Sequence, residues 1–513
     1  MSADGSLSLS LVSHTNAGKT TLARTLLGRD VGEVRDAAHV TEFADVHTLI
    51  ETPAGEKLLL WDTPGFGDSA RLVRRLRQAS NPIGWFMTQV WDRWRDRPLW
   101  SSQQAIRNVR DEADVMLYLV NAAESPEAAG YVKHEMDVLA WVGKPVIVLL
   151  NQLGPPGSRA DEAAELARWR AHLGSSAPVA GVLSLDAFAR CWVQELTLWR
   201  AVEAALESEA DRAVMARLRE AWGARQNVTF EASMQALAAS LARLGAAAEP
   251  LPEAAGLRSG LRQAGRLIGI GRNESSPAEA AQVALAGRLA EEVRESTLEL
   301  IHLHGLSGQA QGEILARLAT HYQLRAHVDE GKAALWGGML TGALMGLKAD
   351  VLSGGLTLGG GMLTGGVLGA LGAAGLARGV NLVRGADRSW VSWSAEALDA
   401  MVDAALLRYL AVAHFGRGRG DWAEGESPPH WREVVAGSLA RHRDALGLLW
   451  AGRPAPQPAS RDAEALIAPL HAVLSAAAAD ALATLYPIAA DFFDAAPAPA
   501  LRESAVQPAS DAR

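Results

Sequence analysis

The sequence predicts an α/β domain with a mostly parallel sheet over residues 1–207, followed by an all-α C-terminal region. The first part alternates short apolar runs with amphipathic stretches, which is the pattern of strand–helix–strand units. From about residue 190 onward, long stretches rich in Ala, Leu, Glu and Arg predict helices instead. Because 513 residues exceed what one hydrophobic core usually organises, at least two domains are expected.

The composition limits which binding partners and which cellular compartment are expected. The net charge of −9 and pI near 5.9 argue against nucleic acid as a partner, and none is expected. Cys191 is the single cysteine, which excludes an intramolecular disulfide and a cysteine-built zinc site and fits a reducing cytoplasm. The first residues lack a basic region followed by a long apolar core, so no signal peptide is expected.

Six apolar runs are predicted to form the strands of the sheet. A hairpin turn, Pro53-Ala54-Gly55, separates the second run from the third, so one edge of the sheet should be antiparallel. The predicted strands are 7–12, 42–52, 57–62, 115–121, 145–151 and 179–185.

The most informative motif is the octet Ser-His-Thr-Asn-Ala-Gly-Lys-Thr at residues 13–20, between the first predicted strand and a predicted helix at 19–27. In a phosphate-binding loop, backbone N–H groups surround the β-phosphate, the lysine meets the β/γ oxygens, and the hydroxyl that follows reaches Mg²⁺. Lys19 and Thr20 take these two roles here. The predicted nucleotide-binding residues of the loop are Asn16, Ala17, Gly18, Lys19, Thr20 and Thr21.

A second motif, Asp62-Thr63-Pro64-Gly65, follows the third apolar run. Asp62 at a strand end can hold Mg²⁺ through water, and Gly65 offers a backbone N–H to the γ-phosphate. We predict Thr41 as the switch threonine that closes on the metal, with Thr48 and Thr52 as alternatives. Lys19 and Thr41 are the predicted catalytic residues, and Thr20, Thr41 and Asp62 are the predicted Mg²⁺ ligands. Asn151 and Gln152, after the fifth strand, are the predicted base contacts.

On these motifs the first ~200 residues resemble a GTPase domain of the translation-factor-related class, close to the Era and MnmE type. The whole chain resembles a bacterial family of predicted GTPases whose C-terminal half is a domain of unknown function. The segments that carry this resemblance are 13–20, 151–154, 186–190 and the glycine-rich segment. The resemblance implies a Ras-like fold, GTP and GDP as ligands, Mg²⁺ as cofactor, and slow GTP hydrolysis.

Three departures from the family pattern bear on chemistry. Ser13 replaces the leading glycine of the loop. Gln152 and Gly154 replace the lysine and aspartate of the base motif, which leaves the choice between guanine and adenine open; Asp186 is a candidate substitute. Phe66 stands where Ras-like proteins place the water-orienting glutamine. Asn16 matches the asparagine that helps hold K⁺ in MnmE- and dynamin-like GTPases, so the resemblance implies K⁺-stimulated hydrolysis.

The rest of the chain divides by composition. A Trp-rich insertion at 71–104 follows the second motif, and it fits either a clamp between domains or an element at a membrane interface. Helical regions are predicted at 208–330 and 386–490, and a disordered tail at 491–513.

Between the helical regions, residues 331–385 form a glycine-rich apolar segment. Its glycines recur every four residues in two sets, and 333–377 carries only two charged residues, Lys348 and Asp350. Such stripes let helices pack closely, so the segment predicts a helical hairpin that either enters the cytoplasmic membrane or lies buried in a soluble core. The membrane alternative places the protein at the inner face of the cell membrane.

Three functions remain open at this level. The first is a conformational switch that binds and slowly hydrolyses GTP, with membrane contact through 333–377. The second is a dynamin-like, membrane-associated scaffold in which nucleotide governs formation of a homo-oligomer. The third is a degenerate nucleotide-binding module with negligible turnover.

Overall fold

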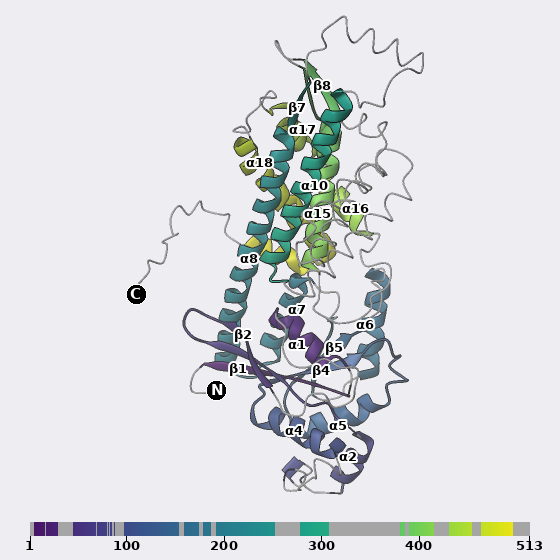
Figure 1. Ribbon diagram of the computed structural model, residues 1–513. Coiled ribbons are helices and arrows are strands. Elements are labelled where there is room, and N and C mark those ends of the chain that lie inside the picture. The colour runs from purple at the N-terminus through teal and green to yellow at the C-terminus, as the bar shows by residue number, and fades with distance from the viewer. Residues whose placement is uncertain are drawn as a thin grey trace, which may run out of the picture.

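The computed structural model consists of a sheet-based domain and an elongated helical region that extends from one face of the sheet (Figure 1). The structure describes sixteen stretches of the chain: 5–15, 17–28, 45–67, 69–78, 81, 83–84, 87, 97–152, 159–173, 178–185, 191–251, 277–306, 380–384, 389–414, 430–453 and 463–495.

The sheet has six strands in the order β2-β3-β1-β4-β5-β6. All neighbours are parallel except β2 and β3, which pair antiparallel with Asp45 opposite Asp62, so the predicted antiparallel edge is confirmed. Gly55 turns the hairpin with a φ of 89°, a conformation that favours glycine. The strands are β1 (Ser6–Ser13), β2 (Asp45–Glu51), β3 (Lys57–Asp62), β4 (Val115–Asn121), β5 (Val146–Asn151) and β6 (Val179–Ser184).

Helices cover both faces of the sheet, as a parallel sheet requires. Along β1 the side chains alternate: Leu9 and Leu11 pack in one core cluster, and Val12 packs in the other. The second cluster lies under α2 (Ser69–Leu76), α4 (Arg97–Asp111), α5 (Tyr131–Val142) and α6 (Arg159–Leu173). The first lies under α1 (Lys19–Leu27) and α7 (Trp192–Ala205) and continues into the helical region.

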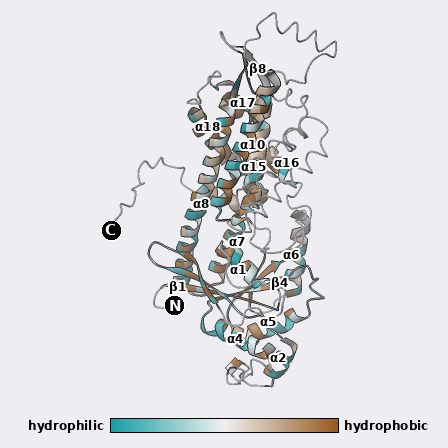
Figure 2. Ribbon diagram, in the orientation of Figure 1, coloured by the Kyte–Doolittle hydropathy of each residue, from teal (hydrophilic) through white to brown (hydrophobic). Residues whose placement is uncertain are grey.

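The helical region is built around α8 (Glu209–Ala246), a helix of 38 residues that runs from the sheet along the length of the bundle (Figure 1). The side chain of Ser208 caps its first turn by accepting from the Asp211 N–H. Hydrophobic residues are prominent on α15 and α18 (Figure 2). The other helices are α10 (Pro277–Leu303), α15 (Ala395–Ala413), α16 (His430–Ala440), α17 (Arg443–Ala451), α18 (Glu464–Leu485) and α19 (Ile488–Ala495).

The prediction of an all-α C-terminal region needs one amendment, because a small antiparallel sheet lies within it. The sheet has the order β7-β9-β8, formed by β7 (Ala248–Leu251), β8 (Val380–Arg384) and β9 (Ser389–Trp393). Its middle strand contains Trp390, Val391 and Trp393, aromatic and β-branched residues that suit a strand buried on both faces. Strands β8 and β9 pair across the predicted boundary at 385/386.

The predicted start of the disordered tail at residue 491 is wrong, because residues 491–495 belong to α19. Asp491 pairs with Arg200 at 2.8 Å, and the Phe492 ring lies 5.1 Å from that of Trp192. These contacts tie the end of the helix to α7. The Ala/Pro-rich composition that suggested a tail begins only after this aromatic pair.

Two predictions from the sequence concern residues outside the described stretches. These are the glycine-rich segment at 333–377 and most of the tryptophans of the 71–104 insertion. Among the described residues, one helix, Glu464–Leu485, is long and apolar enough to cross a membrane by length and composition, with 44% of its apolar window buried inside the protein. Such a helix is also common in a soluble core, and α18 packs against α8.

Candidate nucleotide-binding site

The loop at 13–20 lies between the end of β1 and the start of α1, as the sequence predicts. Gly18 precedes the helix with a φ of 91°, and a Cβ at this position would lie 2.6 Å from Asn151 Nδ2. Glycine is therefore required here for both conformation and space. The same Asn151 amide donates to the Ala17 carbonyl at 2.9 Å, which ties the end of β5 to the loop.

Lys19, Thr20 and Asp62 meet at the carboxyl ends of β1 and β3. Thr20 Oγ1 donates to Asp62 Oδ2 at 2.6 Å, and Lys19 Nζ donates to Ser13 Oγ at 3.0 Å. Burial lowers the pKa of Lys19, and the charge of Asp62 partly offsets this effect. Burial likewise raises the pKa of Asp62, against the hydrogen bond from Thr20 and the charge of Lys19.

The arrangement fits a hard divalent cation. Asp62 is 4% exposed, and its Oδ1 is buried with no hydrogen-bond partner among the described residues. A buried carboxylate oxygen without a partner is costly, whereas a cation or its bound water would satisfy it. Thr20 and Asp62 are thus the residues that would hold Mg²⁺. Among the described residues, no group of three or more His, Cys, Asp or Glu side chains forms a further metal site.

Gly65, at the end of the second motif, packs directly on the loop. A Cβ added there would lie 3.1 Å from both Lys19 Nζ and Thr15 Cα. The next residue, Phe66, donates its N–H to the Ser13 carbonyl at 2.8 Å and accepts from Thr15 Oγ1 at 2.8 Å through its own carbonyl. The two motifs, about forty residues apart in sequence, therefore form one continuous surface.

Comparison of the sequence with protein-family models identifies the domain that carries this surface. Residues 8–152 match the family model described as "50S ribosome-binding GTPase", and residues 326–464 match "Domain of unknown function (DUF3482)". The chain carries an N-terminal GTPase domain. The predicted family resemblance and the fold, a P-loop GTPase domain followed by a helical C-terminal region, are confirmed.

Solved structures that match part of the chain include GTPases of low sequence identity. An Aquifex aeolicus Era variant bound to GDP and aluminium fluoride is 18% identical with a TM-score of 0.27, and the match covers 42% of this chain and 57% of that one. Era in complex with MgGDPNP and 16S ribosomal RNA is 17% identical with a TM-score of 0.28 and the same coverage. The chain thus spans little more than half of the length of these Era structures.

A third match is an oligomerised bacterial dynamin pair described as sensing and tethering membranes. It covers 93% of this chain and 78% of that one, at 8% identity and a TM-score of 0.25. No curated protein matches the chain significantly.

The predicted base contacts of the GTPase domain lie beside the loop. Asn151 is fully buried at the end of β5, and Gln152 follows with a φ of 58°. A Cβ at Gly18 would lie 3.6 Å from Gln152 Nε2, so both side chains reach the start of α1. Gly154 and Asp186, on which the choice of base depends, lie outside the described residues.

The predicted switch threonine Thr41 and the predicted K⁺ contact Asn16 also lie outside the described residues. The two alternatives to Thr41 can be placed. Thr48 pairs with Leu59 in the middle of the β2–β3 hairpin, and Thr52 bonds with Glu56 at its turn, the end remote from Asp62. Thr52 is therefore too far along the hairpin to meet the metal site.

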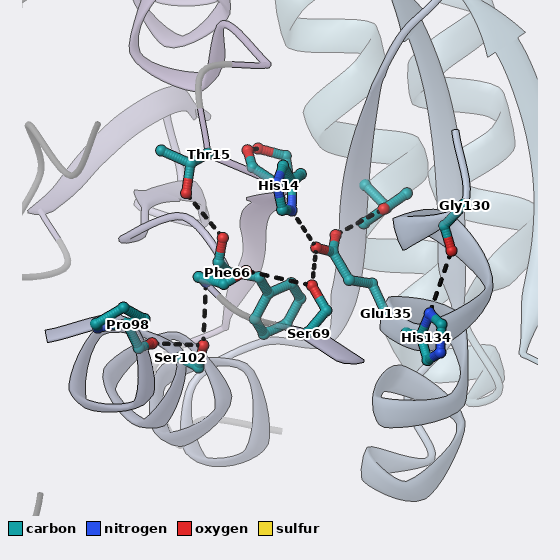
Figure 3. A network of polar contacts seen from close by, with 12 residues as sticks. His14, Thr15, Phe66, Ser69, Pro98, Ser102, Gly130, His134 and Glu135 are labelled. Atoms are coloured by element: carbon teal, nitrogen blue, oxygen red, sulfur yellow. Dashed lines mark hydrogen bonds and ion pairs between the residues drawn. The ribbon is translucent and has the colours of Figure 1, made fainter. Parts of the chain in front are cut away.

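Sequence analysis missed a group of residues beneath the loop (Figure 3). Glu135 of α5 is fully buried, and its carboxylate meets His14, Ser69 and Tyr118 at 2.7, 2.5 and 2.7 Å. A signal was present in the sequence, because a glutamate on the apolar face of a helix is unusual unless it is paired. That face of α5 includes Leu139, one turn further on, which packs in the core.

Proposed function

We propose that the chain binds GTP with Mg²⁺, hydrolyses it slowly, and acts as a conformational switch. The observation that carries this proposal is the convergence of Lys19, Thr20 and Asp62, with the Gly65 backbone packed against them. These groups come from two motifs that the fold brings together in the order required of a GTPase domain.

Catalysis by this site is positioning and charge neutralisation. Lys19 carries positive charge to the β/γ oxygens, and its buried position strengthens that interaction. Thr20 and Asp62 would hold Mg²⁺, which when bound would supply positive charge to offset the charge that develops on the phosphate oxygens. Phe66 is fully buried in the core, so its side chain does not orient the attacking water. Slow turnover follows from that substitution.

The helical region is positioned to respond to the nucleotide through α8. Arg217 of α8 forms a bidentate ion pair with Glu56 of the β2–β3 hairpin, with its shortest distance at 2.6 Å. The hydrogen bond from Arg217 lowers the pKa of Glu56. Arg225 donates to the Leu49 carbonyl on β2. Because this hairpin leads directly into Asp62, a shift in the metal site would be transmitted to α8.

Three finer features of the proposal rest on the sequence. Contact with the inner face of the cytoplasmic membrane is proposed through 333–377, K⁺ stimulation through Asn16, and nucleotide-governed self-association as the dynamin-like alternative. Hydrolysis at equal rates in K⁺ and Na⁺ would rule out K⁺ stimulation. A protein that stays monomeric with GTP and lipid vesicles would rule out self-association.

The first experiment is equilibrium binding of fluorescent GTP, GDP and ATP in the presence and absence of Mg²⁺. We expect guanine nucleotides to bind more tightly than ATP, and Mg²⁺ to strengthen binding of GTP. Equal affinity for GTP and ATP would show that the altered base motif has removed guanine selectivity. Absence of binding for all three would contradict the proposed function.

Coupling to the helical region is tested by hydrogen exchange of α8 with GDP and with a non-hydrolysable GTP analogue. We expect the α8 segment near Arg217 and Arg225 to change its protection between the two ligands. Arg219, which pairs with Glu203 of α7 instead of the hairpin, provides a matched control. An Arg217→Gln, Arg225→Gln variant should lose the change, whereas Arg219→Gln should keep it.

A further inference from the structure

Glu135 is a buried carboxylate that the proposed reaction does not use. It joins three parts of the GTPase domain: His14 in the phosphate-binding loop, Ser69 at the first residue of α2, and Tyr118 in β4 (Figure 3). The His14 ring also stacks on Tyr131 at 4.4 Å, which fixes its orientation above the carboxylate. Glu135 is therefore the common point of the loop and the start of α2.

The segment 65–69, of which the structure describes residues 65–67 and 69, joins the second motif to α2, and its described residues are held from several sides. Ser69 Oγ lies 2.5 Å from Glu135 Oε1, and the Gly67 N–H donates to Ser102 Oγ of α4 at 3.2 Å. A Cβ on Gly67 would lie 2.4 Å from Pro98 Cβ, so α4 presses closely on the segment. Together with the two bonds between Phe66 and the loop, these contacts hold the segment against the loop.

This packing affects a triphosphate and a diphosphate differently. In a GTPase site the lysine and the N–H of the second-motif glycine both bind the γ-phosphate, so a phosphoryl group must fit between them. Here Gly65 packs closely on Lys19 Nζ. With Lys19 Nζ in this position, a γ-phosphate that reaches both groups would push the segment outward, whereas a diphosphate makes no such demand. A bond that restrains the segment therefore disfavours the triphosphate.

We infer that Glu135 is a positioning residue that ties the segment 65–69 to the phosphate-binding loop through Ser69 and His14, and so lowers the affinity for GTP relative to GDP. The inference rests on the proposed function, since it concerns regulation of the same site. A ligand shifts a switch by binding one conformation better than another, and the Ser69–Glu135 bond would stabilise the conformation in which the segment lies against the loop.

A role in stability alone would also explain a buried, fully bonded glutamate, and Tyr118 separates the two explanations. Its hydroxyl bonds to the same carboxylate, but Tyr118 lies in the sheet and contacts neither the loop nor the segment 65–69 through that bond. Burial and the charge of Glu135 raise the pKa of Tyr118 well above its ordinary value, so the hydroxyl remains a donor. Removing the Tyr118 hydroxyl takes one hydrogen bond from the Glu135 carboxylate but leaves its bonds to Ser69 and His14 in place.

The experiment measures dissociation constants for GDP and for the non-hydrolysable analogue GDPNP, with Mg²⁺, on the full chain. In Ser69→Ala we expect the GDPNP affinity relative to GDP to rise about five-fold, the effect of one net hydrogen bond. In Tyr118→Phe the ratio should stay within about two-fold of wild type. Glu135→Gln should also stay within about two-fold of wild type, because its carbonyl can still face His14 and Ser69 and only the bond from the Tyr118 hydroxyl is lost.

Two results would overturn the inference. One is an unchanged ratio in Ser69→Ala, and the other is an equal rise in Ser69→Ala and Tyr118→Phe, which would mean that the network only stabilises the fold. Both leave the proposed function intact if wild type binds the two nucleotides. A wild-type chain that binds neither GDP nor GDPNP would overturn the proposed function and this inference together.

Discussion

The helical region should lose stability in mild acid because it buries His414 in its neutral form. The side chain is 8% exposed at the end of α15, with Nδ1 2.6 Å from the Leu410 carbonyl and Nε2 2.8 Å from the Tyr486 hydroxyl. Because a carbonyl only accepts, Nδ1 carries the proton, and neutral Nε2 accepts from Tyr486. Protonation of Nε2 would remove that acceptor and place a charge among buried groups beside Trp431.

The magnitude follows from the pKa of His414, which burial lowers from 6.5 to about 4. The unfolded chain binds a proton near pH 6.5, while the folded chain resists it until about pH 4, so stability is complete above 6.5 and decreases as the pH falls. The full pKa shift of His414 corresponds to about 3 kcal/mol of unfolding free energy. About 1.3 kcal/mol of this is lost between pH 7.5 and 5.5.

The assay is urea unfolding at pH 7.5 and 5.5 at constant ionic strength, on wild type and His414→Gln. Glutamine can donate to Leu410 and accept from Tyr486 but does not titrate in this range. Subtracting the two proteins cancels other titrating groups, including His304, whose pKa burial also lowers to about 4. Wild type should lose about 1.3 kcal/mol more than the variant. Equal losses in the two proteins would refute the reasoning.

Three further predictions concern single side chains. Gly18→Ala should weaken nucleotide binding at least about ten-fold without unfolding the chain, as titration with labelled GDP would show, because its Cβ would lie 2.6 Å from Asn151 Nδ2. Thr20→Val should remove the Mg²⁺ dependence of GTP affinity, since the hydroxyl that bonds to Asp62 is lost; retained dependence would argue against Thr20 as a ligand. Arg408→Ala should lower the free energy of unfolding by about 2–4 kcal/mol in urea titrations, because buried Arg408 donates to the Val293 carbonyl and two hydroxyls.

The sheet could be predicted from sequence because buried parallel strands read as continuous apolar runs. Strands β3 and β4 begin and end at the predicted residues, and the turn at Gly55 marks the antiparallel edge. The small sheet of the helical region could not be predicted in the same way. Its strands are only four or five residues long, and Ala248 pairs with Ser392, a distant partner that local patterns do not reveal.

The same contrast applies to the candidate site. The positions of Lys19, Thr20 and Asp62 follow from motifs in which residue type and spacing are local properties of the chain. The network around Glu135 depends on tertiary contacts: His14 and Glu135 are 121 residues apart, and only the fold shows that they meet. A charged residue on an apolar helix face signalled that a partner existed but not which one.

The central claim is that the chain hydrolyses GTP at the site formed by Lys19, Thr20 and Asp62. The most direct test is phosphate release from GTP and from ATP, with Mg²⁺, by wild type and by Lys19→Ala. We predict slow release from GTP that exceeds release from ATP and falls at least about a hundred-fold in the variant, because the charge on the β/γ oxygens is no longer neutralised. Release that is absent in wild type, or equal in wild type and Lys19→Ala, would contradict the account.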